Sequence, residues 1–243
     1  MLSAEDNRCR IAVAGFLSSI VVAAAVSAGE AMPDTASQPL AAIVRPVPPE
    51  VFSPNPTSEV STRLIEKYYE SIHQWGTIVA GQVQPVDGHP AWRYLGLPQH
   101  TEDDVRPTAY AAMVLSFLAR YELPQSSADG VDRDQWRESA TCLLRYLTAS
   151  HVSGGGACVN GKPWGNQWQS AMWARAVGMA GWFLWEDLDR DLQTAVARLI
   201  VSEADRFLNQ SPKSSLRNDT GAEENAWNAL ITSLACNMMP AHP

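Results

Sequence analysis

The sequence is poor in cysteine and in basic residues, and each shortage excludes a class of site. Only four of the 243 residues are cysteine and none forms a Cys-x-x-Cys pair, so a cysteine-based metal site is not expected. The five histidines show no metal-ligand spacing. Asp and Glu outnumber Lys and Arg by 26 to 18, and the resulting net charge of −8 argues against nucleic acid, because phosphates are held by basic surfaces. We expect no metal, no cofactor and no nucleic-acid partner.

The sequence also lacks a phosphate-binding loop and a long hydrophobic run. The glycines at 154–156 are not followed by Gly-Lys-Ser/Thr. The apolar run over 11–26 is shorter than the roughly 20 residues of a membrane span. Arg8 and Arg10 precede this run and small residues follow it, which predicts a signal peptide over 1–28 and a secreted or periplasmic protein. Apart from an uncleaved signal, no membrane span is expected.

Export would permit disulfides, but the cysteine spacing does not assign one. The signal peptide would remove Cys9. The three that remain are Cys142, Cys158 and Cys236, an odd number. The oligomeric state is likewise not predicted.

Strand-like alternation is absent over any useful length, and two compositional segments follow the signal. Seven prolines between 33 and 56 predict an extended linker over 29–58. Residues 59–243 show helical periodicity throughout, with a turn-rich loop between 81 and 98.

Two kinds of helix alternate in this domain. Amphipathic helices, in which charged residues such as Asp189, Arg198 and Glu203 face outward, alternate with helices that are apolar on every side and must be surrounded by protein. This alternation predicts an all-α fold, an α/α toroid of about three helical hairpins that forms an incomplete ring. The amphipathic helices are expected at 60–75, 132–150 and 188–209, and the apolar ones at 107–121, 167–185 and 222–239.

A polar segment precedes each apolar helix. These leading segments are His100–Pro107, His151–Gln169 and Asp219–Asn228. Short hairpin loops would make the apolar helices point the same way, with Pro107 in the first turn of its helix. The leading segments would then meet at one end of the ring and form a site there.

Two of the leading segments resemble a known group of enzymes. Lys162–Gln169, with the sequence KPWGNQWQ, and Asp219–Asn228, with DTGAEENAWN, resemble the α/α-toroid carbohydrate-active enzymes. These are the six-hairpin glycosidases and the heparinase II/III-like and chondroitin-AC/alginate-type lyases, and the resemblance covers roughly 60–243. It implies an exported enzyme with a sugar-binding cleft at one end of the ring. Because the full ring has six hairpins, we expect this sequence to be a partial chain.

Candidate catalytic groups come from all three leading segments. Glu102, Asp103 and Asp104 are close enough to raise one another's pKa, as a general acid requires, although acids at a helix start also simply complement its dipole. A neutral imidazole in a loop can act as a base, and the resemblance implies that Asn225 neutralises a uronate carboxylate. The candidates are Asp103, Asp104, His151, Glu224 and Asn225.

Candidate binding groups lie beside them. Arg106 could pair with the neighbouring acids or hold an acidic sugar. Tryptophan stacks on sugar rings but also fills gaps between helices, and an amide on an apolar helix needs a partner. The candidates are Arg106, Trp164, Gln167, Trp168, Trp227 and Asn228.

The sequence therefore predicts an exported enzyme that cleaves a poly- or oligosaccharide. Acids outnumber bases in the leading segments, which favours a glycoside hydrolase, since that reaction needs one protonated and one ionised carboxyl group. The alternatives are a polysaccharide lyase of the heparinase or alginate-lyase type and a non-catalytic α-solenoid that binds a glycan or a protein. The predicted pair of carboxyl groups is one of Glu102, Asp103 and Asp104 together with Glu224.

Overall fold

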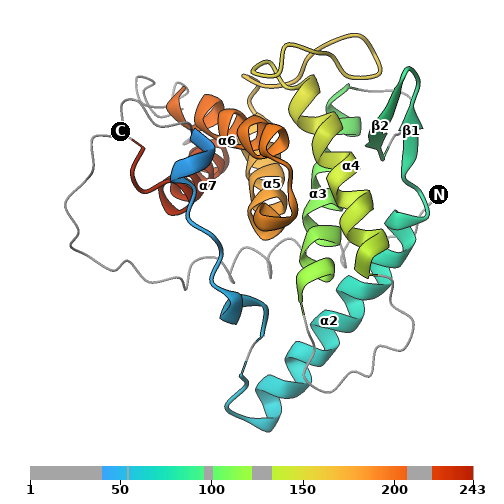
Figure 1. The fold of residues 1–243 in the computed structure, drawn as a ribbon. Helices are drawn as coiled ribbons and strands as arrows, with labels where there is room; N and C mark the ends of the chain where they lie inside the picture. The colour runs from blue at the N-terminus through green and yellow to red at the C-terminus, as the bar shows by residue number, and fades with distance from the viewer. Residues whose placement is uncertain (1–39, 54, 96–100, 122–132, 207–220, 243) are drawn as a thin grey trace.

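The protein is mostly helical, as expected for an all-α fold (Figure 1). The computed structural model describes residues 40–53, 55–95, 101–121, 133–206 and 221–242, and no side chains at 101–104. Its long helices are α2 (Glu59–Ala80), α3 (Thr101–Arg120), α4 (Arg133–Ser150), α5 (Ser170–Phe183), α6 (Arg190–Asp205) and α7 (Ala222–Met238).

The helices alternate between two positions in the molecule. Helices α3, α5 and α7 pack in series, α3 against α5 and α5 against α7. Helices α2, α4 and α6 cover them, and α4 also contacts α6. This arrangement reproduces the alternation of apolar and amphipathic helices in the sequence, because a helix that is apolar on every side needs neighbours on every side.

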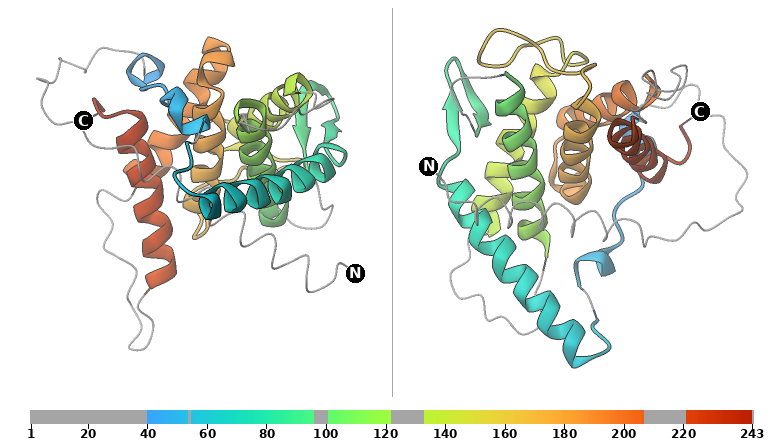
Figure 2. Two further views of the ribbon diagram at one scale, coloured as in Figure 1. Left: turned by 90° about the horizontal axis from the view of Figure 1, so that it is seen from below. Right: turned by 180° about the vertical axis from the view of Figure 1, so that it is seen from behind.

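The direction of α7 differs from the expected parallel arrangement. Helices α3 and α5 run side by side in the same direction, and α4 runs back along α3 (Figure 1). Helix α7 is seen nearly end-on in Figure 1 and from the side in the left view of Figure 2, so it crosses α5. The crossing is close at Gly178, where a Cβ atom would lie 2.3 Å from Ile200 and 2.7 Å from Leu234. Glycine at this position lets side chains from α6 and α7 reach the backbone of α5.

A β-hairpin occupies part of the segment that we expected to be loop. Strands β1 (Gln84–Val86) and β2 (His89–Tyr94) pair in an antiparallel manner around Asp87-Gly88, and Gly88 has a φ of +77°. Asp-Gly is a strong hairpin signal, but these strands are too short to show the expected alternation. The hydroxyl of Thr108 on α3 accepts a hydrogen bond from the N–H of Leu95 at 3.0 Å, which fixes the end of the hairpin.

The described part of the expected linker is packed against the domain. The 3-10 turns η1 (Leu40–Ile43) and η2 (Pro49–Phe52) lie in this segment, and Phe52 is only 4% exposed. The N–H of Arg45 donates to the carbonyl of Met238 at 2.7 Å, and the indole N–H of Trp182 donates to the carbonyl of Arg45 at 2.5 Å. Prolines exclude regular helix here, but they do not prevent burial of the apolar residues between them.

The start of α3 also differs from the prediction. Helix α3 begins six residues before Pro107, which therefore lies inside the helix and not in its first turn. The predicted signal peptide at 1–28 lies outside the described residues. Within the part of the chain that is described, no helix has the length and apolar character needed to cross a membrane.

Candidate functional site

Helix α5 leaves one narrow stripe uncovered. Twelve of its fourteen residues are buried, and the exceptions are Met172 and Arg175. Trp168, four residues before Met172, is 48% exposed. Met172 and Arg175 are three residues apart, so their side chains lie on one face of α5, and Trp168 immediately precedes this helix.

The start of α3 contributes Tyr110 and Arg106 next to this stripe. They are one helical turn apart, with Arg106 exposed and Tyr110 half-buried. Burial raises the pKa of the Tyr110 hydroxyl, and the charges of Arg106 and Arg175 oppose that rise. Burial also lowers the pKa of Arg175, which Tyr110 partly offsets. The charges of Arg106 and Arg175 therefore both act on the Tyr110 hydroxyl.

The leading segments of α5 and α7 meet through two tryptophans. The ring centroids of Trp168 and Trp227 are 5.5 Å apart with an interplanar angle of 53°. Trp227 lies in the second turn of α7 and is half-buried. The expected convergence of these two segments is therefore present, although α7 crosses α5. An aromatic pair with exposed ring surface can hold the flat face of a ligand.

Three other predicted residues lie near Trp227 in the sequence of α7. Glu224, Asn225 and Asn228 are half-buried in the first two turns, and the N–H of Asn225 donates to the carbonyl of Gly221 at 2.9 Å. Helix α3 begins at the same end of the molecule as α5 (Figure 1). The side chains of Asp103 and Asp104, which belong to that start, lie outside the described part of the structure.

A second polar cluster is fully buried and centres on Glu203. We expected Glu203 to face outward, but its side chain is 0% exposed. One carboxylate oxygen accepts from the N–H of Asn166 at 2.9 Å and lies 3.3 Å from Nε2 of His151. The other accepts from the Ser170 hydroxyl at 2.9 Å and lies 3.0 Å from Nε of Arg206. Four groups from the glycine-rich loop, α5 and the end of α6 therefore converge on one carboxylate.

This cluster keeps Glu203 ionised. Burial by itself would raise its pKa, but the hydrogen bonds from His151 and Asn166, the charge of Arg206 and the Ser170 hydroxyl outweigh burial, so the pKa lies below its ordinary value. The Nδ1 atom of His151 accepts from the N–H of Ser153 at 3.1 Å. The proton of a neutral imidazole therefore sits on Nε2 and points to Glu203.

The same cluster explains where three predicted site residues lie. His151 is 0% exposed, and its ring packs edge-on against Trp164 at 4.6 Å. Trp164 is also buried and donates its indole N–H to the carbonyl of Leu147 at 2.9 Å. The backbone carbonyl of Gln167 accepts from Arg206 at 3.0 Å. In this structure these groups hold the glycine-rich loop in place and do not line the uncovered stripe.

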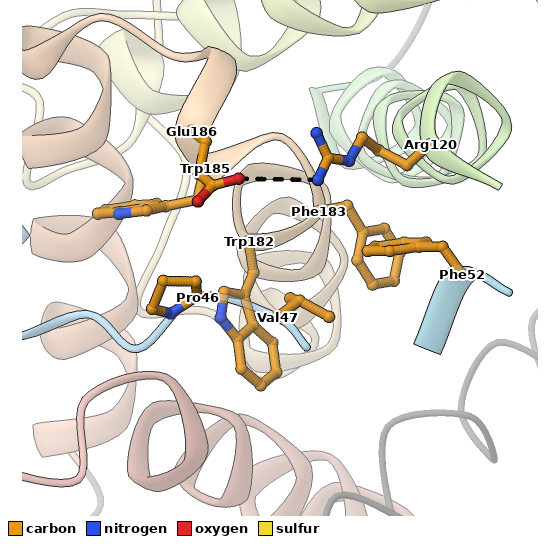
Figure 3. Close-up of a pocket in the computed structure, with 8 residues that line it drawn as sticks. All are labelled: Pro46, Val47, Phe52, Arg120, Trp182, Phe183, Trp185 and Glu186. Atoms are coloured by element: carbon orange, nitrogen blue, oxygen red, sulfur yellow. Dashed lines mark ion pairs between the residues drawn. The ribbon is translucent and has the colours of Figure 1, made fainter. Parts of the chain in front are cut away.

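Two cavities lie at the opposite end of α3 and α5. The first has a volume of about 10 Å³, room for roughly one water molecule. Figure 3 shows the N-terminal segment packed there over the end of α5, with the ion pair of Arg120 and Glu186 at 3.8 Å drawn as a dashed line. The second, of about 310 Å³, is lined by Arg120, Arg133 and Arg137 among others. Arg120 and Arg137 both pair with Asp187 at 3.5 Å. Residues of the N-terminal segment line both cavities.

The residues that sequence reasoning missed are Tyr110, Met172, Arg175 and Glu203. Arg175 carried a usable signal, because it is the only charged residue in an otherwise apolar helix. Glu203 carried none, since its position belongs to the outward face of an amphipathic helix. Among the described residues no group of three or more metal-ligating side chains is found. Comparisons with protein-family models, curated proteins and solved structures found no match.

Proposed function

We propose that this protein binds and cleaves a poly- or oligosaccharide at the surface formed by Trp168, Trp227, Glu224 and the uncovered stripe of α5. The observation that carries the proposal is the contact of Trp168 with Trp227. A tryptophan that is 48% exposed, beside a second ring at 5.5 Å, leaves apolar ring surface in water at a place where two polar leading segments meet. Sugar rings have apolar faces and polar edges, and such a surface offers partners for both.

The arrangement of the helices supports the same proposal. Three pairs of covering and covered helices follow one another along the chain, an order also found in an α/α toroid. The N-terminal ends of α3 and α5 lie at the same end of the molecule (Figure 1). We propose that these pairs are hairpins of such a ring, in an exported protein. Hydrolysis would use Glu224 with one of the acids of the α3 leading segment, one as general acid and the other as base or nucleophile.

The experiment measures glycan binding and cleavage in parallel. Wild type, Trp168→Ala and Glu224→Gln are incubated with a panel of neutral and acidic polysaccharides, and binding, new reducing ends and ultraviolet absorbance of unsaturated sugar ends are followed. Trp168→Ala should weaken binding at least about tenfold, since truncating a central aromatic contact costs more than about 1.4 kcal/mol. Glu224→Gln should abolish turnover while binding persists.

Two control variants change exposed residues that are not part of the proposed glycan-binding surface. Val159→Ala removes a side chain with 45% exposure, close to that of Trp168, and Glu138→Gln repeats the acid-to-amide change on α4. Both should behave as wild type. Reducing ends without ultraviolet absorbance would show hydrolysis, and absorbance would show elimination. If wild type binds no glycan in the panel, the proposed function is wrong.

A further inference from the structure

The larger cavity, at the C-terminal end of α3, is lined by three arginines. Arg120 is the last residue of α3, and Arg133 and Arg137 lie one helical turn apart at the start of α4. None of the described residues that line the cavity carries a carboxylate. Its volume of about 310 Å³ falls within the roughly 300–1,000 Å³ of pockets that hold small molecules. The cavity therefore has room for a ligand and a lining that favours an anion.

Two of these arginines are held by Asp187, which is not part of the cavity lining. The Oδ2 atom of Asp187 lies 3.5 Å from Nη1 of Arg120 and 3.5 Å from Nε of Arg137. Arg120 donates one hydrogen bond, to Asp187, and the guanidinium of Arg137 donates one, to Asp134. The Nε atom of Arg137 is buried and makes no hydrogen bond within the described structure. Since a guanidinium has five N–H donors, most donors of both residues are available to a ligand.

The rest of the cavity lining comes mainly from the N-terminal segment and is largely apolar. Phe52 of η2 is only 4% exposed, and its ring centroid lies 5.7 Å from Cζ of Arg120 (Figure 3). Pro49 and Ala119 add apolar surface, and Ser53, which is exposed, adds a hydroxyl group. The cavity therefore offers charged donors together with apolar surface, the combination that a small organic anion needs.

We infer that this cavity binds a small molecule through a phosphate monoester group, with the organic part of the ligand against Phe52. The inference goes beyond the proposed function, because the cavity lies at the opposite end of α3 and α5 from Trp168, and glycan cleavage does not involve it. A ligand in this cavity would contact η2, the end of α3 and the start of α4 together. It would thereby hold the N-terminal segment against the two helices.

The number of arginines favours a phosphate over a carboxylate. A carboxylate has two oxygens, which a single guanidinium can engage with two parallel N–H donors. A phosphate monoester has three terminal oxygens and a charge of roughly −1.5 to −2 at neutral pH, so it can accept hydrogen bonds from several guanidinium groups at once. Three arginines around one cavity therefore match a phosphate better than a carboxylate.

The test compares compounds that share a phenyl ring and differ in charge. Phenyl phosphate, phenyl sulfate, benzoate and phenol are titrated into the full chain by calorimetry, and inorganic phosphate is titrated separately. Wild type should bind phenyl phosphate about tenfold or more tightly than phenyl sulfate or benzoate, since each further hydrogen bond between charged groups contributes about that factor. Phenol should show no binding. Inorganic phosphate should bind more weakly than phenyl phosphate, because it has no apolar part to bury.

A matched pair of variants at Ser53 tests the charge of the cavity. Ser53→Glu introduces a carboxylate at an exposed position of the lining, and Ser53→Gln introduces a neutral side chain of the same size. Both variants should fold as wild type does, because exposed substitutions have small effects on stability. Ser53→Glu should weaken the binding of phenyl phosphate about tenfold or more by repulsion, whereas Ser53→Gln should stay within about threefold of wild type.

A second pair of variants assigns the binding to an arginine of the lining. Arg137→Gln should weaken the binding of phenyl phosphate about tenfold. Arg198→Gln, at an exposed position of α6 outside the cavity lining, should bind as wild type does. Unfolding temperatures are measured with and without phenyl phosphate, which should stabilise wild type and Arg198→Gln but not Ser53→Glu, because a ligand of the folded state raises its stability.

Several results would overturn the inference. Absence of binding of both phenyl phosphate and inorganic phosphate to wild type at millimolar concentration would remove the site. Equal affinity for phenyl phosphate and benzoate would overturn the phosphate assignment. Unchanged affinity in Ser53→Glu or in Arg137→Gln would show that phosphate binds elsewhere on the protein. None of these results bears on glycan binding, which is measured with other ligands and at another surface.

Discussion

The buried carboxylate of Glu203 offers the sharpest test of how this fold is held together. Replacing it by glutamine keeps the shape of the side chain but exchanges one acceptor oxygen for a donor. The four groups around Glu203 include the N–H of Asn166 at 2.9 Å and Nε of Arg206 at 3.0 Å, which can only donate. In either orientation of the Glu203→Gln amide, its NH2 group faces one of these two N–H donors.

The expected loss of stability follows from the burial of the pair. Removing one partner of a buried ion pair costs about 3–5 kcal/mol, because the remaining charge stays buried and unpaired. The side chain of Arg206 is 15% exposed, so water can reach part of it, and we expect the lower end, about 3 kcal/mol. That is a large share of the roughly 5–15 kcal/mol by which folded domains are stable.

The assay is urea unfolding followed by tryptophan fluorescence. With a urea dependence of about 2 kcal/mol per molar, a loss of about 3 kcal/mol lowers the midpoint by about 1.5 M. Glu186→Gln is the control, since its side chain is 67% exposed and lies 3.8 Å from Arg120, and exposed pairs contribute about 0–1 kcal/mol. A loss below about 1 kcal/mol in Glu203→Gln would refute the reasoning that this cluster anchors the glycine-rich loop.

Three further predictions follow from the same structure. The folded-state pKa of Glu203 lies below its ordinary value of 4.5, so its contribution is present above that pH and is lost as the pH falls through the lower folded value; acid titration of stability should therefore be flatter in Glu203→Gln than in wild type. Gly178→Ala should lower the free energy of unfolding by about 1–3 kcal/mol in the same urea assay, because the added Cβ would lie 2.3 Å from Ile200, and no loss would contradict the close crossing. In the folded protein a thiol reagent should modify Cys236, which is exposed, much faster than Cys158, which is buried, and equal rates would contradict the placement of α7.

The helices could be predicted from the local sequence, because the spacing of apolar and polar residues reflects which faces of a helix are buried. The apolar stretch over 170–183 has no polar face, so it had to become a covered helix, and α5 is that helix. The same logic located α3, α4, α6 and α7 to within a few residues, apart from the early start of α3. The hairpin at 84–94 was not predicted, because strands of three and six residues are too short for their alternation to be recognised.

The tertiary structure alone decided which residues from distant parts of the sequence contact each other. His151 and Glu203 are 52 residues apart, and nothing in the local sequence of either shows that a carboxylate on an amphipathic helix would turn inward to meet an imidazole. The contact of Trp168 with Trp227 was anticipated as two helix starts meeting, but the crossing of α7 over α5 depends on the space at Gly178. Sequence periodicity fixes which face of a helix is apolar, whereas the angle between two helices depends on how side chains from both interlock.

The sequence by itself determined the helical class, the order of covered and covering helices and the polar character of the segments that precede them. Only the tertiary structure decided which polar residues are sealed inside and which remain accessible. His151 and Trp164 lie in a buried cluster, whereas Arg175 is half-buried and forms no ion pair with any described residue. The physical reason is that a residue's type sets what partner it needs, while packing between distant segments sets whether the protein supplies that partner or leaves it to a ligand.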